Sequence, residues 1–216
     1  MSEGGRRLPV YLLLDCSASM SGEPIEAVRQ GVRMLISDLR GNPQALETTY
    51  LSVITFASSA QQVCPLTEVM MFQEPNLEAS GSTSLGEALK LLERALDTEV
   101  RKSSPTQKGD WKPLVFLMTD GQPTDNWEMA ADSIKKRKLG NIIACAAGAG
   151  ADSQLLKRIT EIVVEIHNLQ PDSLKAFFKW VSSSIKTTSQ SVVQVMDDSA
   201  APINLPAPPP QIQIVP

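Results

Sequence analysis

The sequence is poor in the side chains that carry most redox and transition-metal chemistry. Its 216 residues include one histidine and three cysteines, Cys16, Cys64 and Cys145, which lie far apart. An odd number of scattered cysteines, with no C-x-x-C pair and no His/Cys cluster, indicates neither a disulfide framework nor a zinc site. Cys16 would have only His167 as a base if it were a nucleophile, so we expect a packing role for this cysteine.

Long apolar runs and an excess of positive charge are missing too. The apolar run near the start ends at Asp15, which makes it a poor signal peptide and far too short to span a bilayer. The formal net charge of −4 gives no broad attraction to nucleic acid or to an anionic membrane surface. Neither G-x-G-x-x-G nor G-x-x-x-x-G-K-[ST] occurs, which excludes dinucleotide and P-loop sites. We therefore expect a cytoplasmic protein with no nucleic-acid partner and no membrane partner.

What the sequence does contain is enough apolar material for one sizeable core, since 42% of its residues are hydrophobic. Short apolar runs alternate with segments of helical periodicity, which is typical of a parallel α/β sheet. We therefore predict a doubly wound, mostly parallel sheet with helices on both faces, a Rossmann-like arrangement. The predicted strands are 10–14, 51–56, 63–66, 114–118, 141–147 and 162–166, and the predicted helices are 25–39, 85–96, 125–138, 153–159 and 171–186.

Three details of this arrangement are also expected. The 63–66 strand should pair antiparallel with 51–56, and the 114–118 strand, the most hydrophobic, should be central. Thr124 or Asp125 should cap the helix that follows, because short polar side chains are favoured at that position.

The composition changes after about Gln190. Residues 199–216 are rich in alanine and proline, and proline removes backbone donors and favours polyproline II, so this tail should lie outside the core. Its apolar pieces, 203–205 and 212–215, are candidates to lie in a groove or to add to a sheet edge, on this domain or on a neighbouring molecule. We divide the chain into an N-terminal extension (1–8), one domain (9–187) and a Pro-rich tail (188–216).

Three loops beside the predicted strands carry oxygen-bearing side chains: 15–19 after the first strand, 81–84 before a helix, and 119–121 after the central strand. Ligands of open parallel sheets bind outside the carboxyl ends of the strands. If the loops converge there, two carboxylates and three hydroxyls meet in one site. Hard oxygen ligands suit Mg²⁺, with Mn²⁺ and Ca²⁺ as alternatives. The candidate metal ligands are Asp15, Ser17, Ser19, Thr83 and Asp120.

Two negative charges leave a divalent cation open for one more oxygen ligand, which suits capture of a carboxylate from a partner better than chemistry on water. The alternative is a Mg-dependent phosphate-ester hydrolase, because Asp15 stands where aspartyl-phosphate nucleophiles stand in α/β folds. Such phosphatases place a second acid two residues on, and Ser17 has no carboxylate to act as the general acid. We therefore predict a metal-dependent interaction module and not an enzyme. A scaffold that works without metal is a third interpretation.

The three motifs resemble the metal-ion-dependent adhesion site of von Willebrand factor A domains, and the resemblance covers nearly the whole chain up to the tail. It implies that Ser17, Ser19 and Thr83 ligate the metal directly. It also implies that Asp15 and Asp120 act directly or through water, and that the sixth position takes an acidic side chain from a protein partner.

The sequence departs from the family pattern at Cys16, Ala18 and Ser82, where threonine, glycine and glycine are usual. Position 16 is not a ligand, so we expect cysteine to be tolerated there. Positions 18 and 82 bear on loop geometry, because glycine permits backbone angles that other residues resist.

A narrower resemblance, to the TerY-type A-domain proteins of bacterial tellurium-resistance systems, rests on residues 8–15, 21–28, 43–56 and 108–125. Those proteins are associated with a protein kinase and a PP2C-type phosphatase in a phosphorylation triad. The resemblance therefore implies a bacterial stress system in which a Ser/Thr kinase, a PP2C-type phosphatase or both are the partners.

Overall fold

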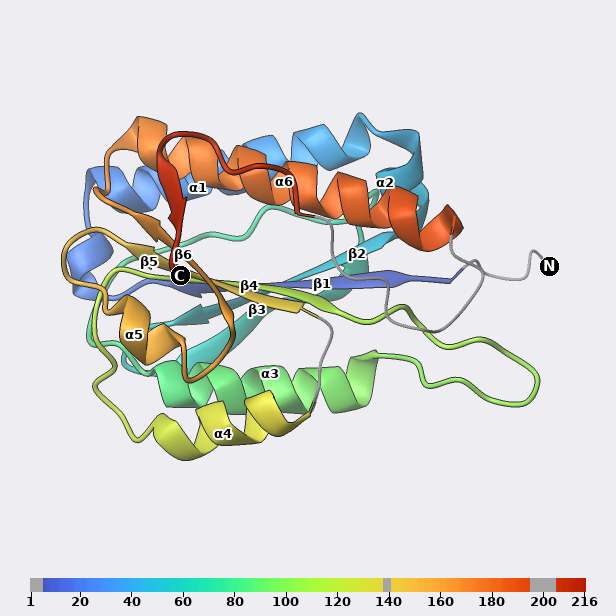
Figure 1. Cartoon of the computed structure of the whole chain (residues 1–216), viewed down its shortest axis with the longest axis horizontal. Coiled ribbons are helices and arrows are strands. Elements are labelled where there is room, and N and C mark those ends of the chain that lie inside the picture. Colours follow the sequence, from blue (N-terminus) through green and yellow to red (C-terminus); the bar gives the residue numbers. More distant parts are fainter. Residues whose placement is uncertain (1–5, 138–140, 195–204) are drawn as a thin grey trace.

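Residues 6–137, 141–194 and 205–216 are described by the computed structural model. Within these ranges seven strands form one sheet in the order β3-β2-β1-β4-β5-β6-β7 (Figure 1). The five inner strands, β2, β1, β4, β5 and β6 in sheet order, pair in parallel. The two edge strands, β3 and β7, are antiparallel to their neighbours. The strands are β1 (Leu8–Asp15), β2 (Thr49–Phe56), β3 (Ala60–Glu68), β4 (Leu114–Thr119), β5 (Asn141–Ala147), β6 (Ile162–Ile166) and β7 (Ile212–Ile214).

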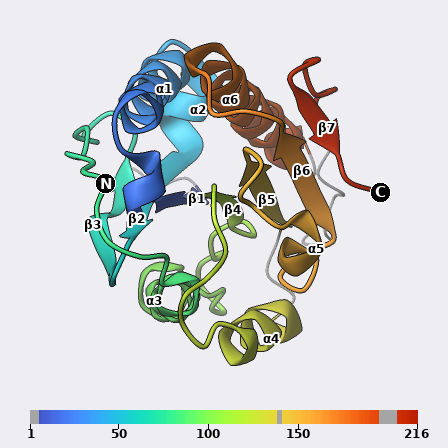
Figure 2. The same ribbon diagram turned by 90° about the vertical axis from the view of Figure 1, so that its left-hand side faces the viewer.

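Helices cover both faces of the sheet, as Figure 2 shows. One face carries α1 (Glu23–Arg40), α2 (Pro43–Thr48) and α6 (Pro171–Gln194). The other face carries α3 (Leu85–Glu99), α4 (Glu128–Lys136) and α5 (Ser153–Leu156). A short 3-10 turn, Ala18–Met20, separates β1 from α1. Among the described helices, none is both long and apolar enough to cross a membrane.

The inner strands β1 and β4 are mainly apolar because both faces of the sheet are covered there. All eight residues of β1 are buried. Side chains alternate between the two faces of a strand, so Leu12 and Leu14 pack in the core under α1 and α6. Tyr11 and Leu13 pack in the second core, under α3 and α4. A strand buried in this way has no polar face to show in its sequence.

The predicted fold class is confirmed: a mostly parallel sheet lies between two helical layers. The antiparallel pairing of β3 with β2 and the central place of β4 are confirmed as well. Helix α2 was not predicted. It is a short helix between α1 and β2, and its N-cap, Asn42, accepts a hydrogen bond from the Ala45 amide. The prediction for α4 was wrong at its start, which is Glu128 and not residue 125, and its predicted end at Lys138 lies outside the described residues.

The C-terminal segment corrects a second prediction. The last helix continues through residue 187 to Gln194, and residues 212–214 form β7 on the edge of β6. Ile212 is only 3% exposed and belongs to the core under α1 and α6, so the prediction that the tail lies outside the core is wrong for this segment. Of the placements that the sequence left open, this segment takes the sheet edge of its own chain.

Candidate metal centre

The carboxyl edge of the sheet brings the ends of β1 and β4 together. These two strands are parallel neighbours, and Leu14 lies opposite Met118. Asp15, the last residue of β1, and Asp120, the first residue after β4, therefore leave the sheet at the same edge. Both carboxylates are buried: Asp15 is 0% exposed and Asp120 is 5% exposed.

The serine loop that follows β1 contacts both of these carboxylates. Ser19 Oγ donates a hydrogen bond to Asp120 Oδ1 at 2.9 Å and lies 3.0 Å from Ser17 Oγ. The Ser17 amide donates to Asp15 Oδ1 at 2.8 Å, which folds the loop back over the strand end. Thr119 Oγ1 donates to the other Asp15 oxygen, Oδ2, at 2.5 Å. The side-chain oxygens of Ser17, Ser19 and Asp120 thus form one connected set, and the Ser17 amide ties Asp15 to it.

Thr83, the fifth predicted ligand, reaches the site from the other side of the Asp120 turn. A β-carbon built on Gly121 would lie 3.6 Å from Thr83 Oγ1, so this hydroxyl stands beside the residue that follows Asp120. The backbone of Thr83 is tied to the same turn: its amide donates to Thr124 Oγ1 at 3.1 Å, and its carbonyl accepts from the Thr124 amide at 2.9 Å. All five predicted residues are therefore brought to one edge of the sheet.

The first loop is fixed to its neighbours through its backbone. The Ala18 amide donates to the Gly81 carbonyl at 3.0 Å, and the Ser80 amide donates to the Cys16 carbonyl at 2.8 Å. Gly81 has a φ of +72°, and a β-carbon there would meet Ser58 Oγ at 2.1 Å. A left-handed backbone and a crowded β-carbon position both favour glycine here. The serine loop and the threonine loop therefore hold each other in place.

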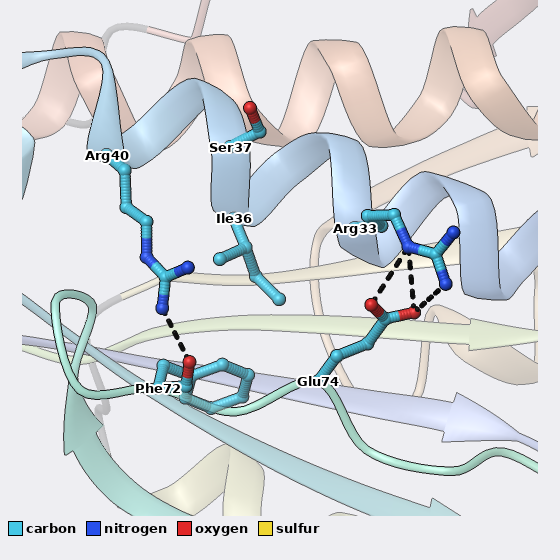
Figure 3. Close-up of a pocket in the computed structure, with 6 residues that line it drawn as sticks. All are labelled: Arg33, Ile36, Ser37, Arg40, Phe72 and Glu74. Carbon is cyan, nitrogen blue, oxygen red and sulfur yellow. Dashed lines mark hydrogen bonds and ion pairs between the residues drawn. The ribbon is translucent and has the colours of Figure 1, made fainter.

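A long segment, residues 69–84, carries Thr83 from the edge strand β3 back to the site. Three arginines of α1 hold this segment against the helix, and two of them, with Glu74, line a small cavity of about 230 Å³ (Figure 3). Their positions, i, i+4 and i+11, fall on one side of a helix. The contacts are Arg29 Nε to the Leu77 carbonyl at 2.7 Å, Arg33 Nη2 to Glu74 Oε1 at 2.9 Å and Arg40 Nη2 to the Phe72 carbonyl at 2.6 Å.

Asp125 fixes the third loop in a way that sequence analysis missed. Its two carboxylate oxygens accept hydrogen bonds from the amides of Gly86 and Glu87, each at 3.0 Å. It therefore caps α3 and not α4, the helix that follows it in sequence, and the prediction of a local cap is wrong. A β-carbon on Gly86 would lie 2.7 Å from the Trp127 α-carbon, so residues 120–127 cross directly over the start of α3.

The two buried carboxylates, Asp15 and Asp120, favour a cation at the site. Burial raises the pKa of Asp120, the neighbouring charge of Asp15 raises it further, and the hydrogen bonds from Ser19 and Ser17 oppose both effects. Two carboxylates and three hydroxyls are hard oxygen donors, so the residues present fit a divalent cation such as Mg²⁺. No group of three or more His, Cys, Asp or Glu side chains suited to a metal exists among the described residues. A cation bound among the five predicted ligands would be balanced by the two negative charges of Asp15 and Asp120.

The remaining sequence candidates take other roles. Cys16 is buried in the core, and burial raises the pKa of its thiol to about 12, which confirms the packing role. His167 is exposed. The sequence analysis did not single out Thr119 for the site, although as the last residue of β4 it stands next to the end of β1, and that strand pairing is the signal that would have found it.

Comparison with known proteins identifies the family. The sequence profile of the von Willebrand factor type A domain matches residues 10–181. A von Willebrand factor A domain-containing protein of Dictyostelium discoideum is 26% identical over an alignment of 190 residues that covers 81% of this chain and 19% of that protein.

Solved structures agree on the fold. A von Willebrand factor type A protein from Catenulispora acidiphila superposes with a TM-score of 0.61 at 20% identity, over 84% of this chain and 43% of the other. Proximal thread matrix protein 1 from the mussel byssus, solved with a zinc-occupied MIDAS motif, gives 0.60 at 20% identity, over 82% and 48%. The chain thus spans less than half the length of each of these relatives. Domains of this kind commonly carry a metal-ion-dependent adhesion site and are generally interaction modules, and the profile match over most of the sequence places this chain in the von Willebrand factor type A domain family.

Proposed function

We propose that this chain is a divalent-metal-dependent protein-interaction module. Asp15, Ser17, Ser19, Thr83 and Asp120 would hold the cation, and a partner protein would supply a glutamate or aspartate carboxylate to it. The observation that carries the proposal is the pair of buried carboxylates at the carboxyl edge of the sheet: Asp120 accepts from the Ser19 hydroxyl, and Asp15 accepts from the Ser17 amide of the same loop. The zinc-occupied MIDAS motif of proximal thread matrix protein 1 supports it as a precedent in the same fold.

The number of ligands at the site supports a carboxylate oxygen from a partner as the incoming ligand. Two aspartates balance a divalent cation, and the three hydroxyls add oxygens without adding charge. The five oxygens leave one position of an octahedral Mg²⁺ open, and an oxygen of a partner carboxylate can fill it. The donor set also favours Mg²⁺ or Mn²⁺ over softer metals, because every proposed ligand is an oxygen.

The identity of the partner is a finer proposal that rests on the resemblance to the TerY-type proteins. Residues 8–15, 21–28, 43–56 and 108–125 carry that resemblance. On this basis the partner is a Ser/Thr kinase, a PP2C-type phosphatase or both, within a cytoplasmic bacterial tellurium-resistance system.

Calorimetric titration with Mg²⁺ and Mn²⁺ tests the metal site. Asp15→Ala and Asp120→Ala should abolish binding while the fold survives, and Thr83→Ala should weaken it less, because a carboxylate contributes charge as well as an oxygen. Ser82→Ala is the matched control: this exposed hydroxyl lies in the same loop but contacts Ser58 Oγ, so metal affinity should not change. Undiminished binding in both aspartate variants would refute the site.

Affinity capture from the native host tests the interaction. The partner should be recovered in Mg²⁺ and lost in EDTA, and replacing its metal-binding acid with the matching amide should weaken the complex sharply. Equal recovery in EDTA would show that the fold surface binds without the metal. A phosphatase assay with and without Mg²⁺ separates the hydrolase alternative, which requires metal-dependent turnover that Asp120→Ala removes.

A further inference from the structure

The edge of β6 is covered by the chain's own C-terminal segment, residues 205–216, which we call the strap. Figure 2 shows β7 beside β6 at the margin of the sheet, away from the edge strand β3. The ladder is short, with three residue pairs from Ile166 opposite Ile212 to Val164 opposite Ile214. One more backbone bond, from the Val215 amide to the Val163 carbonyl at 2.9 Å, extends it.

The domain holds the strap mostly through the backbone of the strap. The Trp180 indole Nε1 on α6 donates to the Pro206 carbonyl at 2.9 Å. Lys157 Nζ, at the end of α5, donates to the Val215 carbonyl at 3.0 Å. The strap thus bridges from the helical layer of α6 to that of α5. Bonds of this kind recognise an extended chain whatever its side chains are.

Apolar side chains also hold the strap: Ile212 is its most buried anchor, and Leu205 and Val215 pack, partly buried, against the two cores of the domain. Ile212 is 3% exposed and sits in the core, whereas Ile214 is 57% exposed. Gln213, between them, is exposed as well. Prolines precede Ile212, and the chain turns between Pro209 and Ile212, where the Ile212 amide donates to the Pro209 carbonyl at 2.9 Å. The segment that fits against the edge of β6 is therefore a proline-rich turn followed by a buried isoleucine and a short strand.

We propose that this groove, formed by the edge of β6 with Trp180 and Lys157, is a second binding site, separate from the metal site. Its ligand is a segment of a partner protein in which a proline-rich turn precedes an isoleucine and a short strand. The strap occupies the groove as an intramolecular competitor. Strand addition at a sheet edge is a known way to bind a peptide segment, and in the strap it is combined with the hydrogen bond from Trp180 to the Pro206 carbonyl. Binding in this groove requires no metal.

The test uses the full chain with its strap weakened by one substitution. Ile212→Asp removes the buried anchor of the strap but leaves Trp180, Lys157 and β6 unchanged. Gln213→Asp adds the same charge at the neighbouring exposed position and is the matched control. The probe is a fluorescent peptide of residues 205–216, with a second peptide in which the isoleucine equivalent to 212 is aspartate.

The wild-type peptide should bind the Ile212→Asp chain saturably, and equally well in EDTA. The wild-type and Gln213→Asp chains should bind it at least about tenfold more weakly, because a tethered competitor acts at an effective concentration near the millimolar range. Adding Trp180→Phe to Ile212→Asp should weaken peptide binding by about two- to tenfold, the usual effect of one lost hydrogen bond.

Cooperative thermal unfolding and retained Mg²⁺ binding report whether the Ile212→Asp chain is folded, and Ile212→Ala replaces it if it is not. The proposal is overturned if the folded variant fails to bind the peptide. It is also overturned if the aspartate peptide binds equally well, or if the wild-type chain binds the probe as tightly as the variant. Dimers of the wild-type chain with exchanged straps would assign the groove to a second copy instead of a partner. Loss of Mg²⁺ binding in Asp15→Ala and Asp120→Ala tests the metal proposal independently.

Discussion

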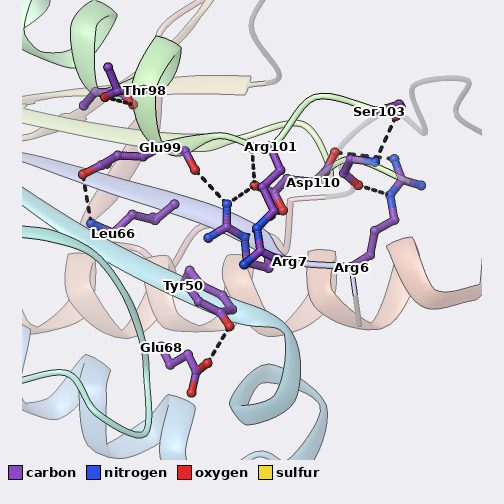
Figure 4. Close-up of polar contacts among 12 residues, drawn as sticks. Arg6, Arg7, Tyr50, Leu66, Glu68, Thr98, Glu99, Arg101, Ser103 and Asp110 are labelled. Atoms are coloured by element: carbon purple, nitrogen blue, oxygen red, sulfur yellow. Dashed lines mark hydrogen bonds and ion pairs between the residues drawn. The ribbon is translucent and has the colours of Figure 1, made fainter. Parts of the chain in front are cut away.

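Replacing Asp110 with alanine should destabilise this chain far more than removing an exposed acid from a similar ion pair. Asp110 lies in the loop between α3 and β4, at the amino edge of the sheet, where it pairs with Arg7 (Figure 4). The two Arg7 bonds to the Asp110 carboxylate measure 2.8 and 2.5 Å, and the Arg101 amide donates to the same carboxylate at 2.8 Å. The Asp110 side chain is 2% exposed and that of Arg7 is 10% exposed.

The magnitude follows from this burial. Among the described residues, Asp110→Ala would leave the largely buried guanidinium with the Glu99 carbonyl, 2.7 Å from Arg7 Nη2, as its remaining hydrogen-bond acceptor. Breaking a buried ion pair on one side costs about 3–5 kcal/mol. For a chain of this size, each kcal/mol lowers the melting temperature by about 2–4 °C, so we expect a fall of about 6–20 °C.

The control is Glu74→Ala, which breaks the ion pair between Arg33 of α1 and Glu74 of the 69–84 segment. The Arg33 side chain is 69% exposed, and exposed ion pairs contribute about 0–1 kcal/mol. Urea and thermal unfolding of both variants provide the comparison. Mg²⁺ affinity of Asp110→Ala should match that of the wild type, because Arg7 and Asp15 stand at opposite ends of β1, about 26 Å apart at the usual rise per strand residue. A loss of stability no larger than that of Glu74→Ala would refute the reasoning.

Two further predictions concern packing. Gly86→Ala would place a β-carbon 2.7 Å from the Trp127 α-carbon, so titration and thermal unfolding should show weaker metal binding and about 1–3 kcal/mol less stability. Gly41→Ala, whose nearest neighbour would be 3.5 Å away, should change little in either assay. Alkylation followed by peptide mapping should modify half-buried Cys64 first, because burial raises the pKa of the other two thiols further and shields them. Modification of all three at one rate in the folded chain would contradict this.

The elements that carry the candidate site were predictable because their signals are local. An apolar run that ends in Asp15, and another that ends before Asp120, give both the strand and the point where it stops. Parallel strands end at the same edge, so the meeting of these two acids follows once the strand order is right. Composition placed β4 in the centre, because a strand that is surrounded on all sides by other elements needs the most apolar sequence.

The sequence alone determined the fold class, the strand ends and the residues offered to a cation, since period and residue type need only neighbouring positions. Only the tertiary structure decided which helix Asp125 caps, how the arginines of α1 hold the segment leading to Thr83, and where Ile212 docks. Each of these contacts joins residues far apart in the chain, and its geometry exists only after the sheet and helices have packed. A carboxylate caps whichever helix start lies within reach, and an extended segment pairs with whichever strand edge is left open, so neither partner can be identified from the local sequence.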